Sequence, residues 1–160
     1  MFSGEVLVAE LQSMGVTHVV WLPDSTLGAW EQALDAAEGI DLIRVSREAE
    51  AWGIAAGLYL GGKTPLVIMQ CTGLFDSGDA LRNFLFDYEL PLFAIVGWRS
   101  SLNPAATDSA RTYTEPILKA WGLEYVAILQ PDELPRLKEH WNRCRQSEQP
   151  GVVLIGEGRL

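Results

Sequence analysis

Apolar and polar residues follow two periods along this chain, one typical of strands and one typical of helices. Short runs rich in β-branched residues predict six strands, at residues 16–22, 41–45, 65–69, 91–96, 124–129 and 151–155. Apolar positions at helical spacing predict helices between them, at residues 2–13, 26–37, 47–60, 78–88, 113–120 and 132–145. Residues 70–77 and 100–108 are predicted as loops. This alternation predicts an α/β fold whose parallel sheet is covered by helices on both faces.

Parallel sheets of this kind bind ligands at the carboxyl ends of their strands. Two of the segments that follow a strand contain a residue suited to cap the next helix: Asp24 or Ser25 before residue 26, and Ser46 before residue 47. The pattern therefore predicts where a site lies, but it does not identify the chemistry. The polar segments after the first four strands are Pro23-Asp24-Ser25, Ser46-Arg47-Glu48, Gln70-Cys71-Thr72-Gly73-Leu74 and Gly97-Trp98-Arg99-Ser100.

The charge balance limits the classes of function. The chain has 160 residues, with 12 Lys and Arg against 21 Asp and Glu, so its formal net charge is −9. Nucleic-acid binding and attachment to anionic membranes both depend on clustered basic residues, so we expect neither. The apolar runs are too short to cross a bilayer, and the first residues lack the features of a signal peptide. We therefore expect a soluble cytoplasmic protein with reduced thiols.

Several motifs with well-defined chemistry do not occur in this sequence. Neither G-x-G-x-x-G after the first strand nor G-x-x-x-x-G-K-[ST] is present, which disfavours dinucleotide binding and a P-loop. The G-x-S-x-G motif of hydrolases is also missing. Cys71 and Cys144 are too few for a metal site or a disulfide framework. We expect His18 to pack within its strand, His140 to be solvated on a polar helix, and no metal ligand in this chain.

The most informative stretch is residues 45–59, VSREAEAWGIAAGLY, in which a carboxylate starts a helix rich in small residues. It resembles the pyrimidine-binding domain of thiamine-diphosphate enzymes, which has a catalytic glutamate followed by Gly-Ile-Ala and a further Gly. Here these are Glu48, Gly53-Ile54-Ala55 and Gly57. Residues 15–25 are similar to the first strand and loop of that family. Residues 69–74 and 95–99 are similar to its sulfopyruvate and phosphonopyruvate decarboxylase branch, and the resemblance covers roughly residues 4–156.

This resemblance implies a three-layer α/β/α sandwich with a six-stranded parallel sheet, and one pyrimidine-binding domain over residues 1–160. It implies that Glu48 contacts the aminopyrimidine nitrogen N1′ of thiamine diphosphate, which requires a carboxyl group in a dry pocket. The alternative is that Glu48 is an ordinary first-turn acid favoured by the helix dipole. The cofactor contacts implied by the resemblance also include Thr72, Gly73 and Leu74.

The residues expected on the substrate side are Asp24, Ser25, Gln70 and Arg99. Each has a simpler alternative. Asp24 and Ser25 can cap a helix. Gln70, with Thr72, can satisfy its own turn. Arg99 suits an anionic substrate or a partner subunit, because its planar fork binds two oxygens at once, but a surface salt bridge is the alternative.

Two departures from the family pattern bear on partners and substrate. The family binds Mg²⁺ and the diphosphate with Gly-Asp-Gly and a downstream Asn, but Gly78-Asp79 is followed here by Ala80. We therefore expect a separate diphosphate-binding beta subunit that holds Mg²⁺, in a homo- or hetero-oligomer. The second departure is that residues 100–111 lack the Gln-His usual in this branch. A small anionic 2-oxoacid is the expected substrate, with another oxoacid, a subunit without turnover, or an unrelated phosphate-binding domain as alternatives.

Overall fold

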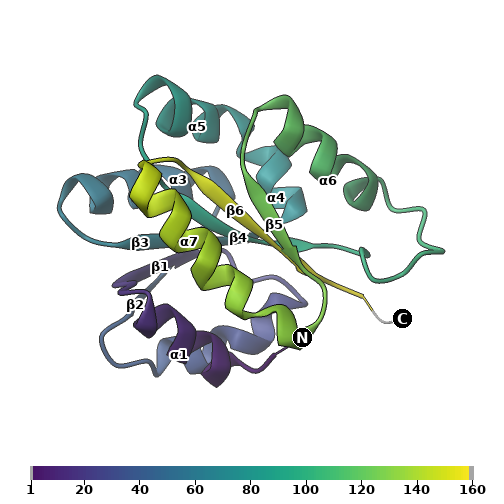
Figure 1. The fold of residues 1–160 in the computed structure, drawn as a ribbon, viewed down its shortest axis with the longest axis horizontal. Helices are drawn as coiled ribbons and strands as arrows, with labels where there is room; N and C mark the ends of the chain where they lie inside the picture. Colours follow the sequence, from purple (N-terminus) through teal and green to yellow (C-terminus); the bar gives the residue numbers. More distant parts are fainter. Residues whose placement is uncertain (1, 159–160) are drawn as a thin grey trace.

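The centre of the molecule is a six-stranded sheet in which every neighbouring pair of strands is parallel. The structure, a computed structural model, describes residues 2–158. The strand order is β2-β1-β3-β4-β6-β5, which Figure 1 shows as a twisted sheet through the middle of the molecule. The strands are β1 (His18–Trp21), β2 (Asp41–Arg44), β3 (Pro65–Gln70), β4 (Phe93–Trp98), β5 (Tyr125–Ile128) and β6 (Gly151–Gly156).

Helices cover both faces of this sheet, so the predicted three-layer α/β/α fold is confirmed (Figure 1). One face is covered by α1 (Gly4–Ser13), the 3₁₀ helix η1 (Leu27–Trp30), α2 (Glu31–Asp35) and α7 (Pro135–Ser147). The other is covered by α3 (Glu48–Leu60), α4 (Cys71–Asp76), α5 (Gly78–Arg82), the π-helix η2 (Asn83–Asp87) and α6 (Ser109–Ala120). The 3₁₀ helix η3 (Pro131–Glu133) precedes α7.

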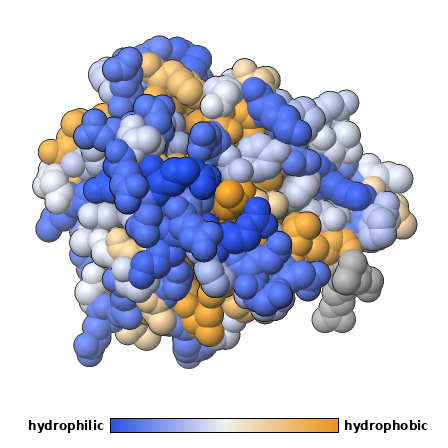
Figure 2. Space-filling model, viewed as in Figure 1, coloured by the Kyte–Doolittle hydropathy of each residue, from blue (hydrophilic) through white to orange (hydrophobic). Residues whose placement is uncertain are grey.

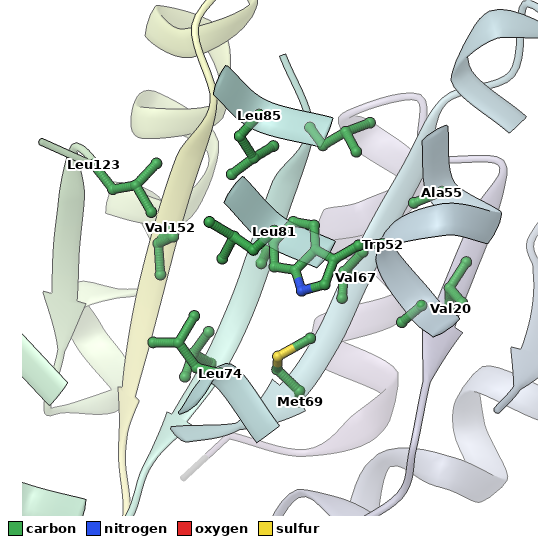
Figure 3. Close-up of a cluster of buried hydrophobic side chains, with 14 of the residues drawn as sticks. Val20, Trp52, Ala55, Val67, Met69, Leu74, Leu81, Leu85, Leu123 and Val152 are labelled. Atoms are coloured by element: carbon green, nitrogen blue, oxygen red, sulfur yellow. The ribbon is translucent and has the colours of Figure 1, made fainter. Parts of the chain in front are cut away.

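Alternating strand residues divide the core into two clusters, one on each face of the sheet. On β1, Val20 contributes to the cluster under α3, whereas Val19 contributes to the cluster under α1. Trp52 is the largest side chain of the first cluster and is fully buried, as expected for a core residue. Its ring lies among the side chains labelled in Figure 3, and its Nε1 donates to the hydroxyl of Ser77 at 3.0 Å. The polar end of the indole is thus satisfied inside the core.

The segment 70–77 was predicted as a loop, and this prediction is wrong. The strand β3 continues to Gln70, and α4 begins at Cys71 without a break. Cys71 and Leu74 both face the core from successive turns of α4, so packing offsets the low helix propensity of Gly73.

Other helix predictions differ from the structure in their internal form. The helix predicted at 26–37 is divided between η1 and α2, and the one predicted at 78–88 is divided between α5 and η2. The predicted loop at 100–108 is confirmed, and α6 begins earlier than expected because Asp108 Oδ1 accepts a hydrogen bond from Ala110 N at 3.0 Å. Capping side chains thus set element boundaries that hydrophobic spacing leaves open.

The surface over α1 and α7 is mainly hydrophilic, as the blue atoms of Figure 2 show. The helix α7 packs on β5 and β6 through Leu137, Trp141 and Cys144, while its other positions are largely exposed. Among residues 2–158, no helix combines the length and the apolar character needed to span a membrane.

Candidate functional site

The chain reverses its direction of winding at the carboxyl ends of β1 and β3. From β1 the chain continues to β2 on one side, and it then returns to form β3 on the other side of β1. Open parallel sheets bind ligands in the crevice at such a point. Asp24 follows β1, Glu48 follows β2, and Gln70 ends β3. The topology therefore brings three of the predicted site residues to one edge of the sheet, hereafter the carboxyl edge.

Glu48 is the first residue of α3, and a different acid caps that helix. Arg47 is the extended N-cap residue, with φ −145° and ψ 144°, so the predicted cap Ser46 is wrong by one position. The Glu50 carboxylate accepts hydrogen bonds from the backbone N–H groups of Ser46 at 3.0 Å and Arg47 at 3.2 Å. Because Glu50 satisfies the start of the helix, Glu48 is not needed for capping.

The half-buried Glu48 side chain lies directly against Gly73, the buried third residue of α4. A Cβ built on Gly73 would lie 2.5 Å from Glu48 Oε1 and 2.6 Å from its Cδ, so the Glu48 side chain would have to move. Only glycine leaves room for the carboxyl group at this position. The buried Leu74 follows Gly73 in α4, while Thr72 is exposed. Of the three predicted cofactor contacts in α4, Gly73 touches Glu48, Thr72 adjoins Gly73 at the surface, and the Leu74 side chain is directed into the core.

Asp24 and Ser25 lie at the carboxyl end of β1. Asp24 Oδ1 accepts hydrogen bonds from the N–H groups of Thr26 at 2.8 Å and Leu27 at 2.9 Å, so it orders the turn before η1, whose N-cap residue is Thr26 rather than the predicted Asp24 or Ser25. Its other oxygen, Oδ2, is buried and has no hydrogen-bond partner within residues 2–158. Ser25 is exposed. Asp24 therefore keeps one unsatisfied carboxyl oxygen at the site.

Gln70 connects the site to a residue that sequence reasoning missed. Gln70 Nε2 donates to Glu157 Oε2 at 3.1 Å, and the Thr72 hydroxyl donates to Gln70 Oε1 at 3.3 Å. Glu157 follows β6 directly and its side chain is only 3% exposed. The polar segment after the sixth predicted strand, Gly156-Glu157-Gly158, is a signal of the same kind as the polar segments that follow the first four strands.

Glu157 has the most perturbed acid–base equilibrium at this edge. Burial, and next the neighbouring charge of Asp24, raise the pKa of Glu157 to about 7, against the opposing effects of Gln70, Thr26 and Arg99. Its backbone N–H donates to the Ser101 hydroxyl at 3.1 Å, which fixes the residue to the loop after β4.

The free carboxyl oxygen of Glu157 lies in an apolar position. Oε1 has no hydrogen-bond partner in the described chain, and it lies so close to Gly97 of β4 that a Cβ at position 97 would overlap with it. The same Cβ would lie 3.1 Å from Leu27 Cδ1, so Oε1 shares this space with an apolar side chain. A buried carboxyl oxygen without a partner is costly, which is the usual mark of a site that a fold keeps for function.

Arg99 lies beside this cluster but is already paired. Its Nε lies 2.9 Å from Asp108 Oδ2, and its side chain is 52% exposed, so the salt-bridge alternative is confirmed. The same Asp108 oxygen accepts a hydrogen bond from the Ser100 hydroxyl at 3.1 Å. Arg99 is thus held at the rim of the carboxyl edge with half of its surface free.

The opposite edge of the sheet holds a second polar cluster, formed by Glu124, His140, Arg143 and Cys144, hereafter the amino-edge cluster. His140 is fully buried, so the prediction that it is solvated is wrong. Arg143 Nη2 donates to its Nδ1 at 2.7 Å, and Cys144 Sγ lies 3.7 Å from the same nitrogen. Helical spacing alone does not show that this face of α7 packs on the sheet. His18 is packed as expected, with a 12% exposed side chain.

Within the described residues, acidic, His and Cys side chains do not gather in a group of three at the carboxyl edge. In residues 2–158, the one group of three His, Cys or acidic residues whose ligand atoms lie within 4.8 Å is Glu124, His140 and Cys144, at the amino edge. Mg²⁺ prefers oxygen ligands in octahedral geometry. The described residues therefore offer no group of three acidic or imidazole ligands for Mg²⁺ at this edge.

The fold and this edge define a class of protein, the pyrimidine-binding type of α/β domain. Residues 1–119 match the family model described as thiamine pyrophosphate enzyme, N-terminal TPP binding domain. The chain therefore belongs to this family of thiamine pyrophosphate enzyme domains.

Three comparisons define its similarity further. The chain is 28% identical to sulfopyruvate decarboxylase subunit alpha of Methanococcus maripaludis over 97% of this chain and 95% of that protein. It is 29% identical to phosphonopyruvate decarboxylase of Streptomyces viridochromogenes over 99% of this chain, but spans only 41% of that protein. A solved thiamine diphosphate-dependent 4-hydroxybenzoylformate decarboxylase of Rhodococcus jostii RHA1 has the same fold, with TM-score 0.67, 16% identity and 97% of this chain matched to 30% of that one.

Proposed function

We propose that this chain is the alpha subunit of a cytoplasmic, thiamine-diphosphate-dependent 2-oxoacid decarboxylase, and that residues 1–160 are its single pyrimidine-binding domain. The observation that carries the proposal is the Glu48 carboxyl group held against Gly73 at the carboxyl edge. The similarity to a sulfopyruvate decarboxylase alpha subunit over nearly the whole of both chains supports this assignment.

The bound cofactor would supply the electron sink on which a 2-oxoacid loses CO₂. In this proposal Glu48 holds a proton at the ring nitrogen N1′ of the aminopyrimidine, which sets the tautomer of that ring. Thr72 and Gly73 would line the position of the ring, whereas the Leu74 side chain is buried in the core beneath them. Gly73 keeps Glu48 in place, because any larger residue would displace the carboxyl group.

The diphosphate and Mg²⁺ belong, in our proposal, to a separate beta subunit. Support comes from the ligand atoms, because the described part of this chain has no group of three acidic, His or Cys ligands at the carboxyl edge. The relatives from Methanococcus maripaludis and Methanothermobacter thermautotrophicus are both named as alpha subunits, which also implies a second chain. The second relative is 32% identical over 62% of this chain and 60% of that protein.

We further propose that the substrate is a small 2-oxoacid with a second anionic group, such as a sulfonate or a phosphonate. The half-exposed Arg99 is the cation at this edge best placed to attract such a group, even though Asp108 already neutralises part of its charge. Gln70 and Ser25 offer neutral hydrogen-bonding groups, and Asp24 orders the loop that carries Ser25.

The direct test is reconstitution with a chain that carries Gly-Asp-Gly and a downstream Asn. The mixture, supplied with thiamine diphosphate and Mg²⁺, should release CO₂ from sulfopyruvate or phosphonopyruvate faster than from pyruvate or benzoylformate. If CO₂ were released only from a different oxoacid, the proposed substrate would be wrong. If no oxoacid released CO₂, the chain would be a subunit without turnover. By calorimetry, this chain alone should bind the cofactor weakly or not at all, and micromolar binding would contradict the two-subunit arrangement.

A further inference from the structure

A chain of two hydrogen bonds crosses the carboxyl edge from a buried acid to the residue that precedes Gly73. This hydrogen-bond chain begins at Glu157 after β6, passes through Gln70 at the end of β3, and ends at Thr72 in the first turn of α4. Thr72 is exposed, and the next residue, Gly73, touches Glu48. The hydrogen-bond chain therefore links a carboxyl group that solvent does not reach to a hydroxyl that faces solvent at the candidate site.

The direction of each hydrogen bond depends on whether Glu157 carries a proton. An ionised carboxylate only accepts, so Gln70 must turn its NH₂ group toward Glu157 and its carbonyl toward Thr72, whose hydroxyl then donates. A protonated carboxyl group can donate to the Gln70 carbonyl instead. The amide would then be turned over, and its NH₂ group would donate to the Thr72 oxygen, leaving the hydroxyl proton of Thr72 free to point into the site.

We propose that Glu157 is a positioning residue that acts through Gln70, because its proton determines whether the Thr72 hydroxyl donates or accepts a hydrogen bond at the candidate site. This role rests on the proposed function, in which Thr72 contacts the cofactor. Glu157 lies outside residues 1–119, which match the family model.

The position of the proton follows from the surroundings of the two carboxyl oxygens. Oε1 lies against Gly97 and Leu27 and makes no hydrogen bond with the described residues, whereas Oε2 already pairs with the Gln70 amide. An unpaired buried donor costs more free energy than a paired one. The proton therefore belongs on Oε2, which already faces Gln70.

The groups around Glu157 keep its proton available near neutral pH. Burial and the Asp24 charge, from the loop after β1, raise the pKa of Glu157 to about 7, while the Arg99 charge from the loop after β4 lowers it. Cys71 on α4 is the other ionisable neighbour, and burial raises the pKa of its thiol, so it stays neutral over this range. The proton of Glu157 thus exchanges within the range where most enzymes work.

The test is an NMR titration of the whole chain, labelled in its glutamine side chains and free of cofactor. The side-chain amide signals of Gln70, identified by their loss in Gln70→Met, should change position with a midpoint at about pH 7, where the carboxyl group exchanges its proton. Glu157→Gln should abolish this titration while the signals stay sharp, because a glutamine there still pairs with Gln70 but does not ionise. Glu139→Gln removes an exposed acid of α7 and should leave the titration as in the wild-type chain.

Two outcomes would overturn the proposal: Gln70 signals that stay constant between about pH 5 and 9, or a titration that persists in Glu157→Gln. Should Glu157→Gln fail to fold, Asp24→Asn provides a second measurement. Asparagine still caps the loop, but it removes the charge that opposes ionisation, so the midpoint should move to lower pH, and an unchanged midpoint would contradict the proposal.

In the reconstituted enzyme, the pH profile of kcat/KM should lose its inflection near pH 7 in Glu157→Gln, with kcat at the optimum reduced by no more than a few-fold. A titrating Gln70 in a protein that decarboxylates no 2-oxoacid would support the relay and contradict the decarboxylase. An active decarboxylase with a constant Gln70 signal would support the proposed function and contradict the relay. The two proposals can therefore fail separately.

Discussion

Both edges of the sheet bury ionisable side chains, but these side chains differ in whether their polar atoms have hydrogen-bond partners. In the amino-edge cluster, buried His140 accepts a hydrogen bond from Arg143 at 2.7 Å, and Arg143 also lies 3.5 Å from Glu124. At the carboxyl edge, Asp24 and Glu157 each keep a buried oxygen that finds no partner in residues 2–158. One cluster is closed on itself, and the other is left incomplete.

This difference separates a structural cluster from a candidate site. A buried polar atom without a partner costs about 1–3 kcal/mol, so a fold retains it only where another group completes it or where the strain has a use. The carboxyl edge is also where parallel sheets bind ligands, whereas the amino edge is not. We therefore propose the incomplete cluster, rather than the more conspicuous group of His, Cys and Glu, as the candidate site.

The largest expected effect is on the carboxyl edge. Glu48→Gln keeps the shape of the side chain but removes its acid–base function, so decarboxylation by the reconstituted enzyme should fall by ~10²–10⁴-fold. Exchange of the C2 proton of the bound cofactor, followed by NMR, should slow in parallel. Glu50→Gln is the matched control, since glutamine also closes the capping box and should leave both rates nearly unchanged. Equal rates in Glu48→Gln and the wild type would make Glu48 an ordinary first-turn acid.

A second prediction concerns the close contact between α3 and α4. Gly73→Ala places a methyl group where the Glu48 carboxyl group lies, so Glu48 must move, and kcat/KM should fall by roughly 10²-fold. Gly57→Ala on the exposed side of α3 meets no atom within 4 Å, and should stabilise the helix by about 0.5–1 kcal/mol with unchanged turnover. Steady-state kinetics and thermal unfolding of both variants test this prediction. Equal kcat/KM values in Gly73→Ala and Gly57→Ala would contradict it.

The two edges should also respond to pH in opposite directions. Because the folded pKa of Glu157 is about 7 against an ordinary 4.5, the unfolded chain releases this proton first as pH rises. Glu157 therefore stabilises the fold at low pH, and this contribution, on the order of 3 kcal/mol, is lost between about pH 4.5 and 7.

The contribution of His140 to stability has the opposite pH dependence. Burial, and next the charge of Arg143, lower its pKa below 6.5, so the unfolded chain binds this proton first as pH falls. Its contribution is present above pH 6.5 and is lost below it. The free energy of unfolding, measured with urea across this pH range, should increase with pH in Glu157→Gln and decrease with pH in His140→Gln. A Glu157→Gln profile that matches the wild type would show that Glu157 is not strained in the fold.

The smallest expected effect is that of zinc on the amino-edge cluster. Three potential ligands lie together there, but the Arg143 guanidinium already occupies His140 Nδ1, and burial raises the pKa of the Cys144 thiol to about 11. A metal would have to displace a cation and remove that proton. Neither the unfolding temperature nor the rate of Cys144 alkylation should change on adding Zn²⁺, and protection of Cys144 by zinc would show that the cluster is a metal site.

The sequence alone determined the layered α/β fold, because hydrophobic periodicity is a local property that records which face of each element is buried. It also placed Glu48 correctly at the start of a helix after a strand, since that boundary lies within a few residues. Only the tertiary structure decided that Glu50, rather than Ser46, closes the start of this helix.

Contacts between distant segments explain what the sequence could not determine. Glu157 and Gln70 are 87 residues apart and meet only because β3 and β6 both flank β4. His140 is buried because α7 packs on β5 and β6, although its own helix is largely polar. The short helix α4 exists because its buried side is anchored on the sheet, which offsets its weak propensity. Spacing along the chain does not encode these distances, so the environment of a single polar residue is decided by the folded structure.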